Sequence, residues 1–249
     1  MLDYRRFTKK ELAGVLEIIH ASMACRDELG LRSLLERLKD LVSGDYSVCG
    51  IGEGGPTGLS ETPRVINGSY PLEWLKIYGE EKFYFKDPVI WNNFQNPGAQ
   101  LWEDTFKIYS EKLSGDFISK ARDFGLCHGL SGGMFDRFSG LSTIFTFAGT
   151  RRNFGHHQKE IISMLSPHLH QALVRIYKDS QKVTSEPLSN REGEVMRWMK
   201  EGKTNWEISV ILSISERTVK FHVQNIEKKL NAVNKAHAIA IAMEQSLVS

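Results

Sequence analysis

The sequence predicts an α+β domain followed by a small all-helical domain. In residues 1–177 amphipathic helices flank a strand-rich centre without regular strand–helix alternation, which favours an α/β/α sandwich around an antiparallel sheet. Residues 178–187 are polar, lack apolar periodicity and contain serine, threonine and proline, so they predict a linker. Residues 188–249 carry repeated helix-capping signals, which predict four short helices.

The first domain is expected to begin and end with helices. Pro71 opens a further helix, because proline fits the first turn of a helix. In order, the expected elements are helices at 9–23 and 27–42, a strand at 46–51, a glycine- and proline-containing loop at 52–62, a strand at 64–69, the helix from 71, strands at 129–135 and 141–148, and a helix at 157–177.

The second domain begins with two capping boxes. Ser189 with Glu192, and Thr204 with Glu207, each combine a side-chain acceptor with a glutamate three residues later. Gly202 supplies a left-handed stop between the two helices. The inward faces of these helices are predicted to be Val195, Met196 and Met199, then Ile208, Ile211 and Leu212.

The third helix follows a short turn and is capped by Ser215. Its predicted buried stripe is Val219, Val223, Ile226 and Leu230. Two helices joined by a tight turn, the second basic and polar outside, are what a helix-turn-helix needs to enter a DNA major groove. From residue 186 onward nine Lys/Arg stand against eight Asp/Glu, so affinity is expected to depend on dimerisation and base contacts as well as on phosphates.

Composition limits the remaining classes. The chain has 249 residues, 41% hydrophobic and 25% charged, as in soluble globular proteins. The N-terminal segment lacks an apolar signal-peptide core and no run of about eighteen apolar residues occurs, so a cytoplasmic protein without membrane contact is expected. Cys25, Cys49 and Cys127 are odd in number and show no C-x-x-C spacing, which predicts free thiols.

Aromatic and acidic residues recur in the first domain. Tyr70, Trp74 and Tyr78 lie four residues apart, on one helical face or at its start, and Asp87 follows just before a proline. Each of these side chains has a polar atom that needs a partner when buried. Ordinary core packing explains the residues equally well, because aromatic stripes at helical spacing are common in cores.

The second domain resembles the DNA-binding domain of LuxR-type transcription factors. The resemblance rests on GKT at 202–204, EI at 207–208 and SERTVK at 215–220, in that order and spacing. Lys220 and Gln224 lie opposite the buried stripe and are expected to point into the groove. The resemblance implies the DNA-binding residues Thr204, Arg217, Thr218, Lys220, His222, Gln224 and Asn225, with Thr218 and His222 as phosphate or capping contacts.

The first domain resembles the acyl-homoserine-lactone-binding domains of LuxR-type receptors. The resemblance rests on Tyr-x-x-x-Trp-x-x-x-Tyr, the following Asp-Pro, and a later Trp and Gly. It implies the ligand-binding residues Tyr70, Trp74, Tyr78, Asp87, Pro88, Trp102, Gly129 and Thr143. By this resemblance Trp74 donates to the lactone carbonyl, Asp87 accepts from the ligand amide and Tyr70 donates to the acyl carbonyl. Thr143 approaches the same amide, and Tyr78 and Trp102 enclose the lactone ring.

Two segments depart from the family pattern. Gly132 and Gly133 stand where relatives usually have a bulky apolar residue and a proline, so the wall facing the acyl chain is expected to be wider or softer. The loop at 53–63 has no counterpart. The sequence therefore does not predict the length or oxidation of the acyl chain.

Other functions find less support. His156, His157, His168 and His170 lack a recognisable metal-ligand spacing, and no metal or cofactor is expected. A phosphorylated receiver domain needs alternating βαβ units, which are missing from the pattern. We expect a dimeric, ligand-responsive transcription regulator that binds an inverted-repeat operator, with RNA polymerase as a candidate partner. Asn234 is expected to cap a last helix, which leaves apolar surface for dimerisation at Ala238, Ile241, Ala242 and Leu247. The alternatives are a regulator sensing a different small molecule and an enzyme acting on acyl-lactones.

Overall fold

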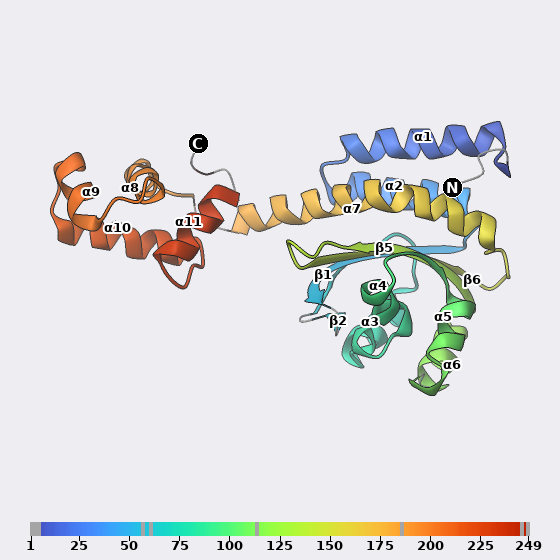
Figure 1. Ribbon diagram of the computed structural model, residues 1–249. Coiled ribbons are helices and arrows are strands. Elements are labelled where there is room, and N and C mark those ends of the chain that lie inside the picture. Colours follow the sequence, from blue (N-terminus) through green and yellow to red (C-terminus); the bar gives the residue numbers. More distant parts are fainter. Residues whose placement is uncertain are drawn as a thin grey trace. The chain divides into compact units, whose positions relative to one another are not determined.

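The computed structural model of the chain describes residues 6–55, 58–59, 62–112, 115–184, 187–244 and 247 (Figure 1). The chain divides into two compact units, Met1–Tyr177 and Lys178–Ser249. Of the predicted loop and linker, residues 56–57, 60–61 and 185–186 lie outside the described part.

The first unit is built on an antiparallel sheet, as the sequence predicted. Within the described residues the strand order is β2-β1-β6-β5-β4, and β3 also pairs with β1. The strands are β1 (Tyr46–Gly55), β2 (Gly58–Leu59), β3 (Arg64–Asn67), β4 (Gly98–Leu101), β5 (His128–Phe135) and β6 (Leu141–Gly149).

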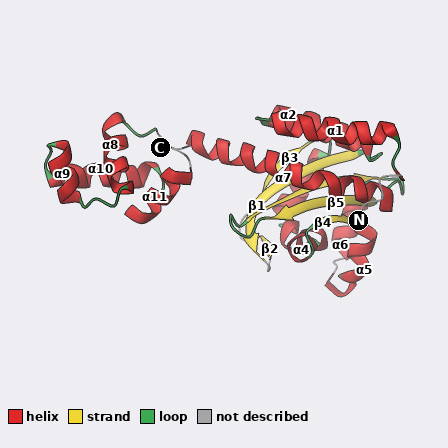
Figure 2. Cartoon of the chain, turned by 45° about the horizontal axis from the view of Figure 1, so that its top comes forward, coloured by secondary structure: helices red, strands yellow, loops and turns green. Residues whose placement is uncertain are grey.

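Helices cover both faces of this sheet and complete the α/β/α sandwich (Figures 1 and 2). One face carries α1 (Lys9–Ala24), α2 (Glu28–Leu41) and α7 (His156–Thr184). The other carries α3 (Leu72–Glu80), α4 (Pro88–Gln95), α5 (Trp102–Ile108) and α6 (Gly115–Asp123).

Strand alternation creates a separate apolar cluster on each face of the sheet. Phe145 and Phe147 of β6 are fully buried in the core formed with α2 and α7. Ile144 and Ala148, one residue out of step, belong to the cluster on the α3–α6 face. The parity of a strand residue therefore decides which layer its side chain enters.

Several elements differ from the sequence prediction. Strand β1 continues to Gly55, and α7 continues to Thr184, so residues 178–184 of the predicted linker are helical. Pro167 lies inside α7 without ending it. The pattern gave no elements between 88 and 123, where α4, α5, α6 and β4 are short and too brief for a clear period.

Beyond the end of α7, the described part of the second unit consists of four helices: α8 (Asn190–Lys200), α9 (Asn205–Leu212), α10 (Glu216–Lys229) and α11 (Lys235–Glu244). Both predicted capping boxes are formed, at Ser189 and at Thr204. Ser213, at φ 53° and ψ 46°, makes the left-handed turn between α9 and α10. The two helices therefore form the predicted helix-turn-helix.

The core of the second unit largely matches the predicted stripes. Val219, Val223, Ile226 and Leu230 are all buried against α8 and α11. Ile211, which was predicted to face inward, is instead 42% exposed. Because α9 has only eight residues, it buries a narrow face: Ile208 and Ser209 are buried and Leu212 packs against the core, while Ile211 lies outside that face.

Candidate ligand pocket and DNA-binding surface

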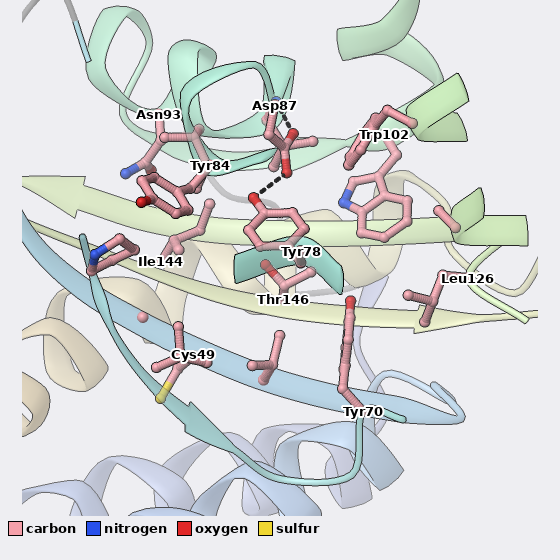
Figure 3. A pocket seen from close by; sticks show the side chains of 18 of the residues that line it. Cys49, Tyr70, Tyr78, Tyr84, Asp87, Asn93, Trp102, Leu126, Ile144 and Thr146 are labelled. Atoms are coloured by element: carbon pink, nitrogen blue, oxygen red, sulfur yellow. Dashed lines mark hydrogen bonds between the residues drawn. The ribbon is translucent and has the colours of Figure 1, made fainter. Parts of the chain in front are cut away.

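A cavity of about 430 Å³ lies in the first unit between the sheet and helices α3–α6 (Figure 3). Tyr70, Trp74, Tyr78, Asp87 and Trp102 all line it, so the structure brings these predicted residues together. A volume in this range suits a small molecule, and the lining is mainly apolar and aromatic.

Asp87 is the acidic centre of the pocket. It caps α4, accepting from the Val89 N–H at 2.8 Å, and its other oxygen accepts from the Tyr78 hydroxyl at 2.8 Å (Figure 3). Burial raises the pKa of Asp87 from 3.8 to about 6, and these two hydrogen bonds oppose the rise. The hydrogen bonds that Asp87 accepts therefore compensate only part of the cost of burying its negative charge.

The Tyr70 hydroxyl is a buried polar group without a partner among the described residues. Burial, and to a lesser extent the charge of Asp87, raises the pKa of Tyr70 well above 10, so the phenol stays protonated and can donate. An unpaired buried hydroxyl is unfavourable by about 1–3 kcal/mol, which a bound acceptor would relieve.

Trp74 forms the centre of an aromatic cluster in the pocket wall. Its ring lies 5.8 Å from that of Tyr78 and about 6 Å from those of Phe83, Phe117 and Phe124. The cluster excludes water from the α3–α6 face of the sheet, and this packing holds α3 and α6 together. The tryptophan is thus held in a fixed orientation at the cavity surface.

Trp102 and Gly129 act as a packing pair. A Cβ on Gly129 would lie 2.3 Å from the Trp102 ring, so only glycine lets the indole lie against β5. The indole N–H of Trp102 donates to the Ser131 hydroxyl at 3.0 Å, and Ser131 is 3.0 Å from the hydroxyl of Thr146. Gly129 therefore shapes the wall and does not itself line the cavity.

Pro88 and Thr143 do not present ligand-binding groups in this structure. Pro88 is the first residue of α4 and lies outside the cavity lining. Thr143 borders the cavity, but its hydroxyl lies 2.8 Å from Nδ1 of His170 in α7. Because alternate residues of β6 face opposite layers, the hydroxyls on the cavity face belong to Ser142 and Thr146.

The expected wide wall at Gly132 and Gly133 is wrong. A Cβ on Gly132 would come within 2.2 Å of Ile162 in α7, and one on Gly133 within 2.4 Å of Asn93 Oδ1. These glycines let neighbouring elements approach closely, and neither lines the cavity. The missing side chains are therefore used for packing, and they add no room for a ligand.

Asn93 is a cavity residue that the sequence analysis missed. It is buried in α4, lines the pocket, and donates to the Ser142 hydroxyl at 2.9 Å and to the Thr143 carbonyl at 3.2 Å. These bonds fix α4, and with it Asp87, to β6. The only signal was a polar residue on the inward side of a helix that begins at Asp–Pro.

The residues at the centre of the outward face of α10 are not all those that were predicted. Residues 217, 221, 224 and 228 recur at helical spacing directly opposite the buried stripe. Arg217, Gln224 and the 58%-exposed Phe221 thus occupy the middle of this face. Lys220 lies to one side and is 3.4 Å from Glu216, the residue one turn earlier.

The remaining predicted DNA contacts have local structural roles. The Thr204 hydroxyl caps α9, accepting from the Glu207 N–H at 3.2 Å. The Thr218 hydroxyl is 2.8 Å from that of Ser215 at the start of α10. His222 and Asn225 are half-buried on the flank of α10. A DNA contact by any of these four residues remains a prediction.

The last helix serves the core more than expected. Ala238 and Ala242 were predicted to remain as surface, but both are fully buried in the core of the second unit, with Ile241 packed against it. Of the four residues predicted to stay outside, only Leu247 is exposed. Another apolar row of α11 does face outward, and its members are Ala236, Ala240 and Met243.

Within the described ranges, no helix is long and apolar enough to cross a membrane. The same residues contain no cluster of three or more side chains suited to hold a metal ion. All three cysteines have free thiols, and burial strongly raises the pKa of Cys49.

A cavity-bearing α/β/α unit followed by a helix-turn-helix defines a ligand-binding regulator of transcription. Residues 27–173 match the family described as "Autoinducer binding domain", and residues 186–242 match "Bacterial regulatory proteins, luxR family". The chain belongs to the LuxR family and is a quorum-sensing type of ligand-binding transcription regulator.

Relatives of known name agree with this assignment. The quorum-sensing regulator RhlR of Pseudomonas aeruginosa is 31% identical over 226 residues, covering 89% of this chain and 91% of RhlR. The transcriptional activator EchR of Dickeya chrysanthemi is 31% identical over 199 residues, covering 75% and 80%. The crystal structure of Escherichia coli SdiA aligns with a TM-score of 0.61 at 25% identity, over 96% of this chain and 99% of SdiA.

Proposed function

We propose that the pocket binds an N-acyl-homoserine lactone and that the second unit binds an inverted-repeat operator as a dimer. In this proposal residues 1–177 are the sensor, 178–187 the connection and 188–249 the DNA-binding domain. The observation that carries the ligand assignment is the buried Asp87 carboxylate, hydrogen-bonded to Tyr78, in the same apolar cavity as the unpartnered Tyr70 hydroxyl.

The chemistry of an acyl lactone suits these groups. Its amide N–H would donate to Asp87, a buried acceptor whose raised pKa indicates too few donors around the charge. Its acyl carbonyl would accept from the Tyr70 hydroxyl, which lacks a partner among the described residues. Its lactone carbonyl would accept from the Trp74 indole. A neutral ligand with one donor and two acceptors thus satisfies three groups at once.

Binding would also stabilise the sensor. A ligand that binds only the folded chain adds RT ln(1 + [L]/Kd), or about 2.7 kcal/mol at a hundredfold excess over Kd. Helices α3 and α4 carry Trp74 and Asp87, so a lactone held between them would join both helices to the sheet. Ligand concentration would then control how much folded regulator is present.

Titration of variants with lactones tests the ligand assignment. Trp74→Phe deletes one indole N–H and should lower lactone affinity by about 1 kcal/mol, while Asp87→Ala removes the acceptor and should lower it by about 1.5–3 kcal/mol or more. We expect the response to fall in the order wild type, Trp74→Phe, Asp87→Asn, Asp87→Ala. Trp91→Phe is the matched control, since the Trp91 indole donates to the Phe85 carbonyl outside the cavity.

Two results would count against the lactone. One is an Asp87→Ala protein that responds like wild type. The other is a wild-type protein whose melting temperature no lactone of any chain length raises. The second result would leave a regulator that senses another amphiphile, and SdiA, of similar fold, has been solved with octanoyl-rac-glycerol.

The dimer proposal rests on the surface of the second unit. Its net charge is small, so two recognition helices on one site would supply affinity that a single one lacks. The outward row on α11, with Met243 more than half exposed, is the apolar surface available for pairing. Met243→Glu should weaken binding to a full palindrome far more than to a half-site. If Met243→Glu weakened binding to the palindrome and to the half-site equally, α11 would not form the dimer contact. RNA polymerase would then remain a candidate partner for the exposed row.

A further inference from the structure

The cavity has two dissimilar ends. Figure 3 shows Tyr70 and Trp102 on one side of the cavity, with Tyr84, Asn93 and Ile144 on the other. The proposed head-group residues gather toward the first side. Strand β1 passes beneath the cavity, and its residues 48–52 span about 13 Å at the usual rise of a strand.

The second end is floored by backbone. Cys49 and Ile51 are buried in the core on the far face of the sheet, so their neighbours Val48, Gly50 and Gly52 face the cavity. Two of these three cavity-facing positions have no side chain, but Leu59 and Pro63 fill the space over Gly52, so only Gly50 leaves open room. The floor is therefore lower at Gly50 than where Val48 lies.

Nothing in the described part of the protein requires glycine at position 50. Its φ is not among the positive values of the described chain, so another residue could adopt its conformation. A Cβ there would meet only the Arg64 carbonyl oxygen at 3.7 Å and Ile144 Cγ2 at 3.8 Å, both ordinary contacts with the flanking strands. Gly129, Gly132 and Gly133, by contrast, would each clash. Glycine weakens the interior of a strand, and it often marks a place that a ligand approaches closely.

The end of the cavity beyond Gly50 is apolar. Gly52 is covered by Leu59 and Pro63, whose atoms would lie 2.9 and 3.3 Å from an added Cβ. Val65 also lines the cavity and is 45% exposed, so this end reaches the edge of the sheet at β3. These side chains accept a hydrocarbon chain, and two polar groups on the same side, the Tyr84 hydroxyl and the Asn93 amide nitrogen, are already hydrogen-bonded to Thr62 and Ser142.

We propose that Gly50 forms the floor of an acyl-tail channel and that this receptor prefers long acyl chains. The inference rests on the proposed binding of an acyl ligand and adds which acyl ligands are bound. Each methylene buried in the channel should raise affinity about fourfold. Affinity should therefore rise steadily from butanoyl to dodecanoyl in the wild-type protein.

A single substitution in the channel floor tests the proposal. Dissociation constants are measured for butanoyl-, octanoyl- and dodecanoyl-homoserine lactone with wild type, Gly50→Ala and Gly50→Leu. Leucine should fill room for about three methylenes, so dodecanoyl binding should fall about sixtyfold while butanoyl binding changes less than about twofold. Alanine should give a loss of about fourfold for dodecanoyl. Gly79→Leu is the control, because Gly79 has open space around it on exposed α3.

The outcomes separate the channel from the head group. Equal losses for all chain lengths in Gly50→Leu, or a wild type that prefers butanoyl, would overturn the channel. If no lactone binds, the lactone proposal fails, and a monoacylglycerol series from butanoyl to dodecanoyl then measures the same chain-length dependence. Absence of any dependence in that series would overturn the channel as well. Melting of Gly50→Ala at or above the wild-type temperature would show that the fold tolerates a side chain there.

Discussion

Replacing Asp87 by asparagine should stabilise the ligand-free protein while weakening its response to ligand. The carboxylate is buried at the start of α4 with donors from Tyr78 and Val89 and no cation beside it. Asparagine has nearly the same shape and keeps an acceptor oxygen. It removes the charge, which is the part of the side chain that burial makes unfavourable.

The size of the effect follows from the pKa. A shift of the Asp87 pKa from 3.8 to about 6 means that ionising this group in the folded chain is unfavourable by about 3 kcal/mol. Asparagine loses one hydrogen bond of about 1 kcal/mol, which leaves a net gain of about 2 kcal/mol. For a unit of this size the melting temperature should rise by about 4–8 °C.

The pH dependence gives the test its sign. Because the folded pKa of Asp87 is raised, the folded state holds the proton more tightly, and wild type gains stability from this group as pH falls through about 6. Melting of the sensor unit should therefore differ between wild type and Asp87→Asn at about pH 8 and converge near pH 4. A constant difference across this range, or an asparagine variant that melts lower at about pH 8, would refute the reasoning.

Three further changes follow from single contacts. Gly129→Ala should destabilise the sensor by about 1–3 kcal/mol in denaturant melts, because its Cβ would overlap the Trp102 ring; unaltered melting would show that the indole can move. Phe221→Ala should reduce operator binding in gel shifts more than Lys220→Ala does, because phenylalanine lies at the centre of the outward face. A larger loss of operator binding in Lys220→Ala than in Phe221→Ala would show that Lys220 lies at the centre of the DNA-contacting face. Glu192→Gln should destabilise the second unit by about 2 kcal/mol above pH 4.5, with the difference shrinking as acid protonates the glutamate, since its lowered pKa reflects the ion pair with Lys229 at 2.8 Å.

The second unit was predicted from sequence because its signals are local. Ser189 and Thr204 start helices through contacts with residues three positions away, and the structure forms both capping boxes. The stripe ending at Leu230 has the period of a helix and is buried. The prediction that Ile211 faces inward was wrong, because α9 is too short for its helical period to show which residues face inward.

The pocket was predicted only in part, because burial in it depends on distant elements. Trp74 and Asp87 could be placed by spacing, and both line the cavity. The face on which Thr143 lies could not be predicted, since a shift of one residue along the strand moves a hydroxyl from the cavity face to the face that contacts His170. Which residues of β6 face the cavity becomes clear only once Phe145 and Phe147 are known to pack on the α7 side of the sheet.

Glycines show most clearly where sequence reasoning stops. Gly132 and Gly50 look alike in the sequence, each inside a run that predicts a strand. In the structure a Cβ on Gly132 would overlap Ile162, whereas one on Gly50 would find only ordinary contacts. The first glycine therefore serves the packing of α7, and the second leaves space inside the pocket. A missing side chain has no pattern of its own, and its meaning comes from what stands opposite. For this reason the proposed head-group contacts rest on Trp74 and Asp87, while the proposed preference for a long tail rests on a residue that contributes no atoms beyond the backbone.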